Sequence, residues 1–302
     1  MDITKIRTLF PVTKEAIYLN SASQSPLNTC VQNKLEAYLK TEITFEGKKG
    51  FNRDDVRIPL ANLLGGSSEE YALSTSTGVG LGMIAQGIYF KKGDNIIIPE
   101  KEHWNNAFPW LHLEKKGIEV RFAKLNKDNS LNPKAIERLI DNKTRFVAVA
   151  AVRFNSGFRP NLGEISKIAH AENALFVVDA AQGAGMVPID VVKDGIDIMA
   201  GCGFKWLLSI GIDTVYKKAL ENTALIINGL LKNNYNLVTP IKNDHERTAI
   251  VHFNANSFTT TKTLFKKLKQ HKLMVTLQGE NIRVSPNFFT TKKEIEVFLS
   301  LL

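Results

Sequence analysis

The chain has 302 residues, of which 44% are hydrophobic and 23% charged, as is ordinary for a soluble globular protein with room for one or two domains. Its 39 Lys and Arg against 30 Asp and Glu give a net charge of +9. These basic residues are scattered as pairs rather than gathered in a run with interleaved aromatics, so no nucleic-acid partner is expected.

The cysteines and the apolar pattern indicate a cytoplasmic protein. Cys30 and Cys202 are far apart in the sequence, so neither a disulfide framework nor a metal-ligand spacing follows. Residues 1–5 lack the basic and apolar regions of a signal peptide, and no stretch approaches a membrane-spanning run. We therefore expect a cytoplasmic protein with no metal site and no membrane partner.

Residues 16–27 are predicted to form a short strand that enters a polar turn, and Asn28 is predicted to cap the helix that follows. The apolar positions of this helix repeat at helical spacing and lie on one face, formed by Val31, Leu35 and Leu39. Residues 41–57 are polar and contain glycine, which predicts a loop before a helix over residues 58–64.

Hydroxyl residues and glycines are concentrated in residues 73–82, directly before the apolar-periodic residues 83–88. A helix that starts with such residues offers an anion site, because free backbone N–H groups and the positive end of the helix dipole face the ligand. Ser76, Thr77 and Gly78 are the candidates for this site. Simple N-capping by Ser or Thr would explain the same residues, and the downstream acid of a dinucleotide site is missing.

Four short runs predict strands, at residues 96–98, 118–122, 146–152 and 175–178. Helical segments separate them, and this repeated alternation indicates an α/β fold with a doubly wound, mainly parallel sheet. Ligands of such sheets bind at the carboxyl ends of the strands, which is where polar residues follow several of these runs.

Asp179 ends the last of these runs, and small residues after it allow a tight turn and the close approach of a flat ligand. Lys205 follows a second apolar patch, between Phe204 and Trp206, neighbours that would desolvate it and make its amine nucleophilic. Pyridoxal phosphate needs a lysine for its Schiff base and a carboxylate that keeps the pyridine nitrogen protonated. A capping aspartate and a surface lysine are the alternative interpretation.

The complete strings 175–185 and 201–207 resemble the class V aminotransferase family of fold type I pyridoxal phosphate enzymes. This family includes cysteine desulfurases, isopenicillin N epimerases and kynureninase-like enzymes. The resemblance implies that Asp179 contacts the pyridine nitrogen, that Lys205 carries the cofactor, and that Gln182 lies near its phenolic oxygen. It also implies pyridoxal 5'-phosphate as cofactor, an amino-acid substrate and a homodimer.

Other motifs extend the resemblance. Residues 102–110 are similar to the family's Glu-His-x-x-Asn-x-x-Pro-Trp pattern, which implies that His103 stacks on the pyridine face. The remaining matches imply contacts to cofactor or substrate: Ser76, Thr77 and Gly78 at the phosphate, Asn155 at the phenolic oxygen, Asn20 beside the substrate and Arg283 at its α-carboxylate. A structural histidine, an ordinary strand–turn at Asn20 and an inter-strand salt bridge at Arg283 are the corresponding alternatives.

The resemblance is interrupted after Leu208, where the chain continues directly into residues 209–216. Family members have a long block here, with sheet strands and a loop that reaches the partner subunit. We therefore expect a large domain that lacks some strands and exposes a sheet edge. Phe204 replaces a Tyr or His of the family, and three further departures lie near the end of the chain: Asn287, Phe289 and Thr290.

Four segments are predicted from these patterns. Residues 1–30 form an N-terminal segment that packs near the small domain, and residues 31–208 form the large cofactor domain. Residues 209–232 form a connecting helix, and residues 233–302 a small α+β domain.

The expected function is that of a pyridoxal phosphate-dependent enzyme acting on an amino acid by transamination, epimerisation or elimination, with catalytic roles for Lys205, Asp179 and His103. Cysteine desulfuration is less favoured, because residues 275–281 contain no cysteine where the family's persulfide-carrying residue belongs. The alternative is a catalytically impaired relative that serves as a cofactor-binding or interaction scaffold.

Overall fold

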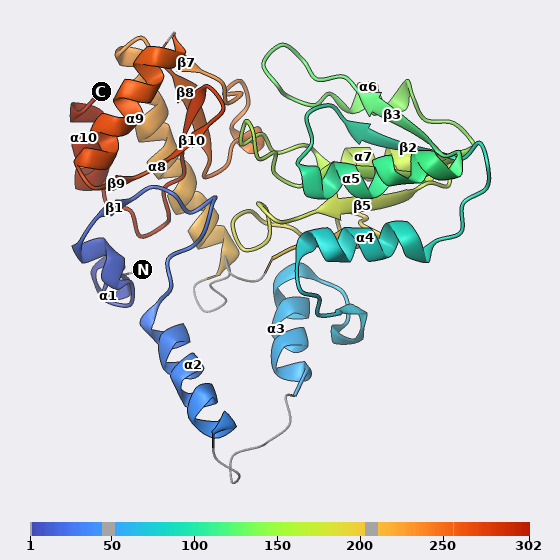
Figure 1. The fold of residues 1–302 in the computed structure, drawn as a ribbon, viewed down its shortest axis with the longest axis horizontal. Helices are drawn as coiled ribbons and strands as arrows, with labels where there is room; N and C mark the ends of the chain where they lie inside the picture. Colours follow the sequence, from blue (N-terminus) through green and yellow to red (C-terminus); the bar gives the residue numbers. More distant parts are fainter. Residues whose placement is uncertain (1, 44–51, 203–210, 256) are drawn as a thin grey trace.

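A five-stranded parallel sheet organises the larger unit of the structure, a computed structural model that describes residues 2–43, 52–202, 211–255 and 257–302 (Figure 1). The spatial order of its strands is β3–β2–β4–β5–β6, and the pairing is parallel throughout. The predicted doubly wound, mainly parallel α/β sheet is therefore confirmed. The strands are β2 (Asn95–Pro99), β3 (Glu119–Ala123), β4 (Thr144–Ala150), β5 (Leu175–Asp179) and β6 (Ile198–Ala200).

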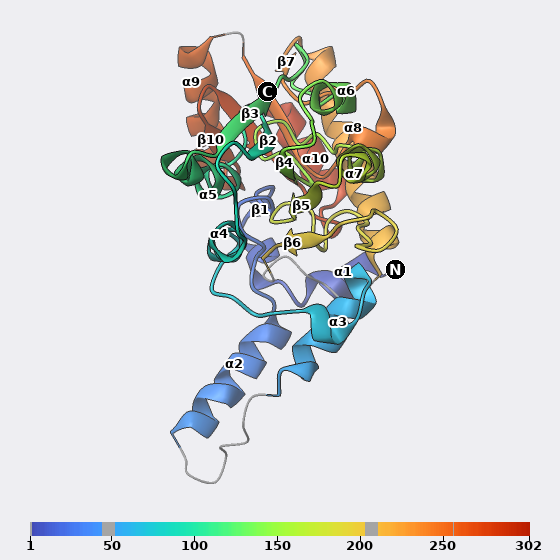
Figure 2. The ribbon, with the colours of Figure 1, turned by 90° about the vertical axis from the view of Figure 1, so that its right-hand side faces the viewer.

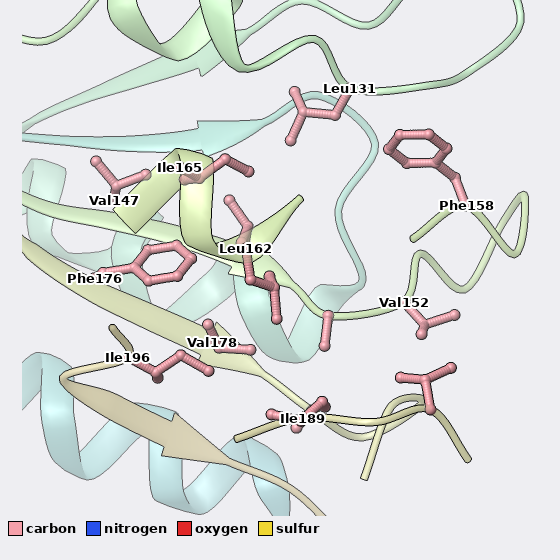
Figure 3. Packing of buried hydrophobic residues seen from close by; sticks show 14 of the residues in the cluster. Leu131, Val147, Val152, Phe158, Leu162, Ile165, Phe176, Val178, Ile189 and Ile196 are labelled. Carbon is pink, nitrogen blue, oxygen red and sulfur yellow. The ribbon is translucent and has the colours of Figure 1, made fainter. Parts of the chain in front are cut away.

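Helices cover both faces of this sheet because its strands alternate apolar side chains between the two faces. Val147 and Phe176 point to the face covered by α6 (Pro133–Glu137) and α7 (Leu162–Ala171), in the cluster drawn in Figure 3. Phe146 and Val177 point to the opposite face, against α4 (Thr77–Gly87) and α5 (Trp104–Leu111). Burial on both faces is what allows the strands to be continuous apolar runs.

The C-terminal unit is a four-stranded antiparallel sheet of order β10–β11–β8–β7 packed with helices. Its strands are β7 (Asn236–Leu237), β8 (Val251–Asn254), β10 (Thr276–Gln278) and β11 (Asn281–Val284). Its helices are α8 (Ile212–Lys232), α9 (Phe258–Gln270) and α10 (Lys292–Ser300). The helix expected between the two domains corresponds to α8.

The N-terminal residues attach to the C-terminal unit. After α1 (Ile3–Arg7), strand β1 (Ile17–Tyr18) pairs in parallel with β9 (Leu273–Met274). Arg7 donates to the carboxylate of Glu294 on α10 at 2.8 Å. Residues near both ends of the described chain therefore lie side by side, as Figure 1 shows.

Helix α2 (Thr29–Glu42) extends away from the body of the molecule, beside α3 (Asp54–Leu64), as both views show (Figures 1 and 2). Asn28 caps α2 as predicted, accepting a hydrogen bond from the N–H of Val31. None of the residues of α2 is buried, so the apolar face predicted for it has no partner in the described part of the chain. Within the same described ranges, no helix has both the length and the apolar content needed to cross a bilayer.

The two units meet at a close backbone contact. Gly157 has φ +72°, and a Cβ atom there would lie 2.3 Å from the carbonyl oxygen of Ile250. Thr248 Oγ1 donates to the carbonyl of Gly157 at 2.8 Å, and the N–H of Arg159 donates to the carbonyl of Glu246 at 2.8 Å. This contact places the loop after β4 directly against the segment that leads into β8.

Candidate active site

A cavity of about 340 Å³ opens at the carboxyl ends of β4 and β5. This is the edge at which open α/β sheets bind their ligands. Five residues predicted from the sequence line it: Ser76, Thr77, His103, Asp179 and Gln182. Further polar or aromatic lining residues were not predicted: Ser23, Ser74, Thr75, Asn105, Phe154 and Cys202.

Asp179 is the last residue of β5 and is 4% exposed. Its Oδ1 accepts a hydrogen bond from the N–H of Ala181 at 2.9 Å, so the turn that follows the strand holds the carboxylate. Ala181, a small residue of this turn, also lines the cavity. A buried carboxylate therefore lines the cavity.

Hydroxyl groups gather at the N-terminus of α4. Ser76 is the N-cap, and its Oγ accepts from the N–H of Val79 at 3.1 Å. Ser74 Oγ donates to the carbonyl of Ser76 at 3.1 Å. Capping and cavity lining thus occur in the same residue, and Ser76 and Thr77 place the N-terminus of α4 at the cavity.

Gly78 does not line this cavity. A Cβ atom on Gly78 would lie 3.2 Å from the side-chain carboxamide of Asn105, at the start of α5. The glycine therefore allows the first turns of α4 and α5 to approach each other, and its contribution to the site is indirect.

His103 is the N-cap of α5, and its Nδ1 accepts from the N–H of Asn105 at 3.2 Å. Its ring meets the ring of Phe154 edge-on, with centroids 4.9 Å apart and an interplanar angle of 89°. Burial lowers the pKa of His103, against an opposing effect of Glu102. Nδ1 of the ring is thus held as a hydrogen-bond acceptor, and the residue lines the cavity.

A buried ion pair lies behind His103. Arg153 Nη1 is 2.7 Å from Glu102 Oε1, and both side chains are 2% exposed. Burial raises the pKa of Glu102, Arg153 opposes that shift, and Asp179 adds to it, so the two carboxylates are close enough to interact. Burial also lowers the pKa of Arg153.

Arg283 lies on β11 and is 6% exposed. It pairs across the sheet with Thr276 on one side and His252 on the other, and burial lowers its pKa. No carboxylate among the described residues forms an ion pair with it, so the inter-strand salt bridge considered as an alternative is not observed there. Its Nε–H is buried and donates to no acceptor among the described residues.

His252 connects Arg283 to the cavity. Its Nε2–H donates to the carbonyl of Phe154 at 3.0 Å, and the ring of Phe154 lines the cavity. Burial, and then the charge of Arg283, lower the pKa of His252 to about 3. The buried guanidinium is therefore separated from a cavity-lining residue by one neutral imidazole.

The structure does not bring all predicted residues to the cavity. Asn155 Nδ2 donates to the carbonyl of Lys101 at 3.2 Å, and the preceding residue, Phe154, takes the lining position instead. Asn20 Oδ1 accepts from Thr276 Oγ1 at 2.5 Å, next to Arg283 rather than in the cavity. Lys205 lies outside the described residues.

Comparison with known proteins shows to which family this chain belongs. The sequence model of the family described as aminotransferase class-V matches residues 17–218. The chain therefore belongs to the class V aminotransferase family.

Among individual relatives, a protein of Methanothermobacter thermautotrophicus named "probable cysteine desulfurase" is 30% identical over 225 residues, 72% of this chain and 56% of that protein. A "probable cysteine desulfurase" of Borreliella burgdorferi is 32% identical over 239 residues, 71% and 56% of the two chains. The chain thus matches little more than half the length of these curated relatives.

Solved structures show the same fold. The cysteine desulfurase CsdA of Escherichia coli superposes with a TM-score of 0.87 at 17% identity, over 100% of this chain and 97% of that one. A cysteine desulfurase of Thermococcus onnurineus superposes with a TM-score of 0.87 at 22% identity, over 99% and 96% of the two chains. A structure of C-DES with glycine covalently linked to its pyridoxal phosphate cofactor superposes with a TM-score of 0.85 at 16% identity, over 97% of this chain and 98% of that one.

Proposed function

We propose that this protein binds pyridoxal 5'-phosphate and acts on an α-amino acid. The observation that supports this most is the buried carboxylate of Asp179 at the end of β5, in one cavity with the ring of His103 and the hydroxyls at the start of α4. The three groups suit the three parts of the cofactor: a pyridine nitrogen that needs a carboxylate, a flat ring and a phosphate. A cavity of about 340 Å³ lies in the range of small-ligand sites.

The residues that would hold the cofactor follow from this fit. Ser76, Thr77 and the first N–H groups of α4 would bind the phosphate, and Asp179 would hold the proton on the pyridine nitrogen. Lys205 is the residue proposed to bind the cofactor covalently. When bound, the cofactor supplies an electron sink for bonds broken at the Cα of the amino acid.

The proposed anchor for the substrate is Arg283. A buried guanidinium without a carboxylate partner in the described residues is costly, and a bound α-carboxylate would supply that partner with two parallel hydrogen bonds. The cross-strand neighbours Thr276 and His252 fix the strand position from which it would act.

The proposed reaction is transamination, epimerisation or elimination at Cα. The relatives above carry the name cysteine desulfurase, but residues 275–281 of this chain contain no cysteine. That segment is a hairpin in which Gln278 and Asn281 pair directly across the two-residue turn Gly279-Glu280. A persulfide carried on this hairpin therefore has no place in the proposal. We also propose that the protein is a cytoplasmic homodimer.

The test is absorbance spectroscopy of the purified protein with added pyridoxal phosphate, with and without borohydride. Wild type should show a visible band that borohydride abolishes while leaving the cofactor covalently attached to the protein, and Lys205→Ala should show neither the band nor the attachment. Lys193→Ala is the matched control, since the side chain of Lys193 is 83% exposed and does not line the cavity. A band that survives Lys205→Ala would refute the assignment of the lysine, and no band in folded wild type would refute the function and favour a scaffold.

A further inference from the structure

The turn between β2 and α5, residues 100–103, places His103 at the cavity and contains an unfavourable backbone conformation. Lys101 has φ +54°, in the left-handed region that non-glycine residues seldom adopt. Such a conformation persists only where surrounding contacts determine it. The contacts at this turn are therefore part of what aims His103.

Side chains from the end of β4 supply those contacts. Arg153 Nη2 donates to the carbonyl of Glu100 at 2.6 Å and to that of Lys101 at 3.2 Å. Asn155 Nδ2 donates to the same carbonyl of Lys101 at 3.2 Å. Two donors thus satisfy the carbonyl of Lys101, the residue of this turn whose backbone is in the left-handed region.

The same guanidinium is also linked, through Glu102, to a residue after the turn. Arg153 Nη1 binds Glu102 Oε1 at 2.7 Å, and the other oxygen of Glu102 accepts from Asn106 Nδ2 at 3.3 Å. The N–H of Asn106 in turn donates to the carbonyl of His103 at 2.8 Å. Arg153 therefore acts on the chain on both sides of His103.

We propose that Arg153 is a positioning residue, which holds turn 100–103 so that the ring of His103 presents its face to the cavity. This inference rests on the proposed function for its consequence, because the ring would lie there against the bound cofactor. Stability alone is a weak reason for such a pair, since well-packed apolar residues commonly replace a buried ion pair without loss. The three hydrogen bonds that Arg153 donates to the residues just before His103 instead indicate that Arg153 positions this histidine.

The test uses the double variant Glu102→Gln/Arg153→Met, which removes both buried charges together so that neither is left unpaired. The first readout is the imidazole ¹⁵N and ¹H spectrum of His103 without cofactor, assigned among the six histidines with His103→Gln. The second is the Kd for pyridoxal phosphate from an absorbance titration. Arg121→Met is the matched control, because Arg121 makes comparable bonds, to Leu139 and Asp141, at a distant strand.

The double variant should fold with a near wild-type melting temperature, while the hydrogen-bonded Nδ1 signal of His103 shifts and broadens. The Kd should rise about three- to tenfold, as expected for a misplaced aromatic contact. Arg153→Lys keeps the charge without the planar fork and should not restore either readout. An unchanged His103 spectrum in the folded double variant would overturn the proposal. A shifted spectrum in a protein whose wild type binds no pyridoxal phosphate would uphold the positioning role and refute the cofactor.

Discussion

Substitution of His252 by Gln should remove a specific part of the acid sensitivity of this protein. His252 is buried between Arg283 and the carbonyl of Phe154, and its pKa falls from 6.5 to about 3 on folding. The unfolded chain therefore binds a proton at this residue before the folded chain does. Stability is lost as the pH falls below about 6.5, and the loss continues towards pH 3.

The magnitude follows from the two pKa values. At pH 5 the unfolded imidazole is protonated and the folded one is not. Because pH 5 lies about 1.5 units below the unfolded pKa, the free energy of unfolding falls by about 2 kcal/mol relative to neutral pH. This figure depends on the unfolded pKa alone as long as the folded pKa lies well below 5. Glutamine keeps an N–H donor for the carbonyl of Phe154 but cannot titrate.

Urea unfolding followed by circular dichroism, at about pH 7.5 and pH 5, measures this difference. The free energy of unfolding of wild type should fall by about 2 kcal/mol more than that of His252→Gln over this interval. His271→Gln, at an exposed histidine, is the control for loss of one imidazole. Equal losses in wild type and His252→Gln would refute the reasoning, because they would mean that His252 is protonated inside the fold.

Three other changes test the fold and site. Gly157→Ala should lower the free energy of unfolding by more than about 2 kcal/mol in urea, because the left-handed φ and the nearby carbonyl of Ile250 both oppose a Cβ atom. Gly163→Ala, in α7, is the control and should be neutral or stabilising. Equal effects of the two substitutions would contradict the backbone contact. Arg153→Met alone should cost about 3–5 kcal/mol by leaving Glu102 buried and unpaired, clearly more than the double variant. Arg283→Lys should raise the KM for an amino acid about tenfold or more through loss of the bidentate fork, and an unchanged KM would exclude it as the carboxylate anchor.

The sequence predicts the fold well because the large unit is built from local patterns. β5 is an apolar run that ends in a carboxylate, and such a run has few alternatives in a chain of alternating strands and helices. Ser76 and Thr77 precede an apolar-periodic helix, so their place at a helix N-terminus also follows from short-range order. α2 shows the limit of this reasoning, because an apolar spacing gives the face of a helix but not whether another element covers it.

The residues of the site that could not be predicted depend on contacts between distant parts of the chain. Arg153 and Glu102 are 51 residues apart, and nothing near either one indicates that both charges are buried against each other. Asn155 is a polar residue just after a strand, which makes it a natural candidate for the cavity. In the structure Phe154 lines the cavity instead, and Asn155 donates to the carbonyl of Lys101 in the turn before His103. Tertiary contacts, rather than the local sequence, determine this arrangement.

The contact between the two units has a consequence for how this sequence can change over evolution. In two of its hydrogen bonds the acceptor is a main-chain carbonyl, that of Gly157 or that of Glu246. The closest approach is that of Gly157 to the carbonyl of Ile250. Main-chain groups are the same whatever side chain a residue carries. In a saturation library, position 246 should therefore accept many amino acids while position 157 accepts almost none, so that Gly157 and the hydroxyl donor Thr248 carry most of the sequence constraint on this junction.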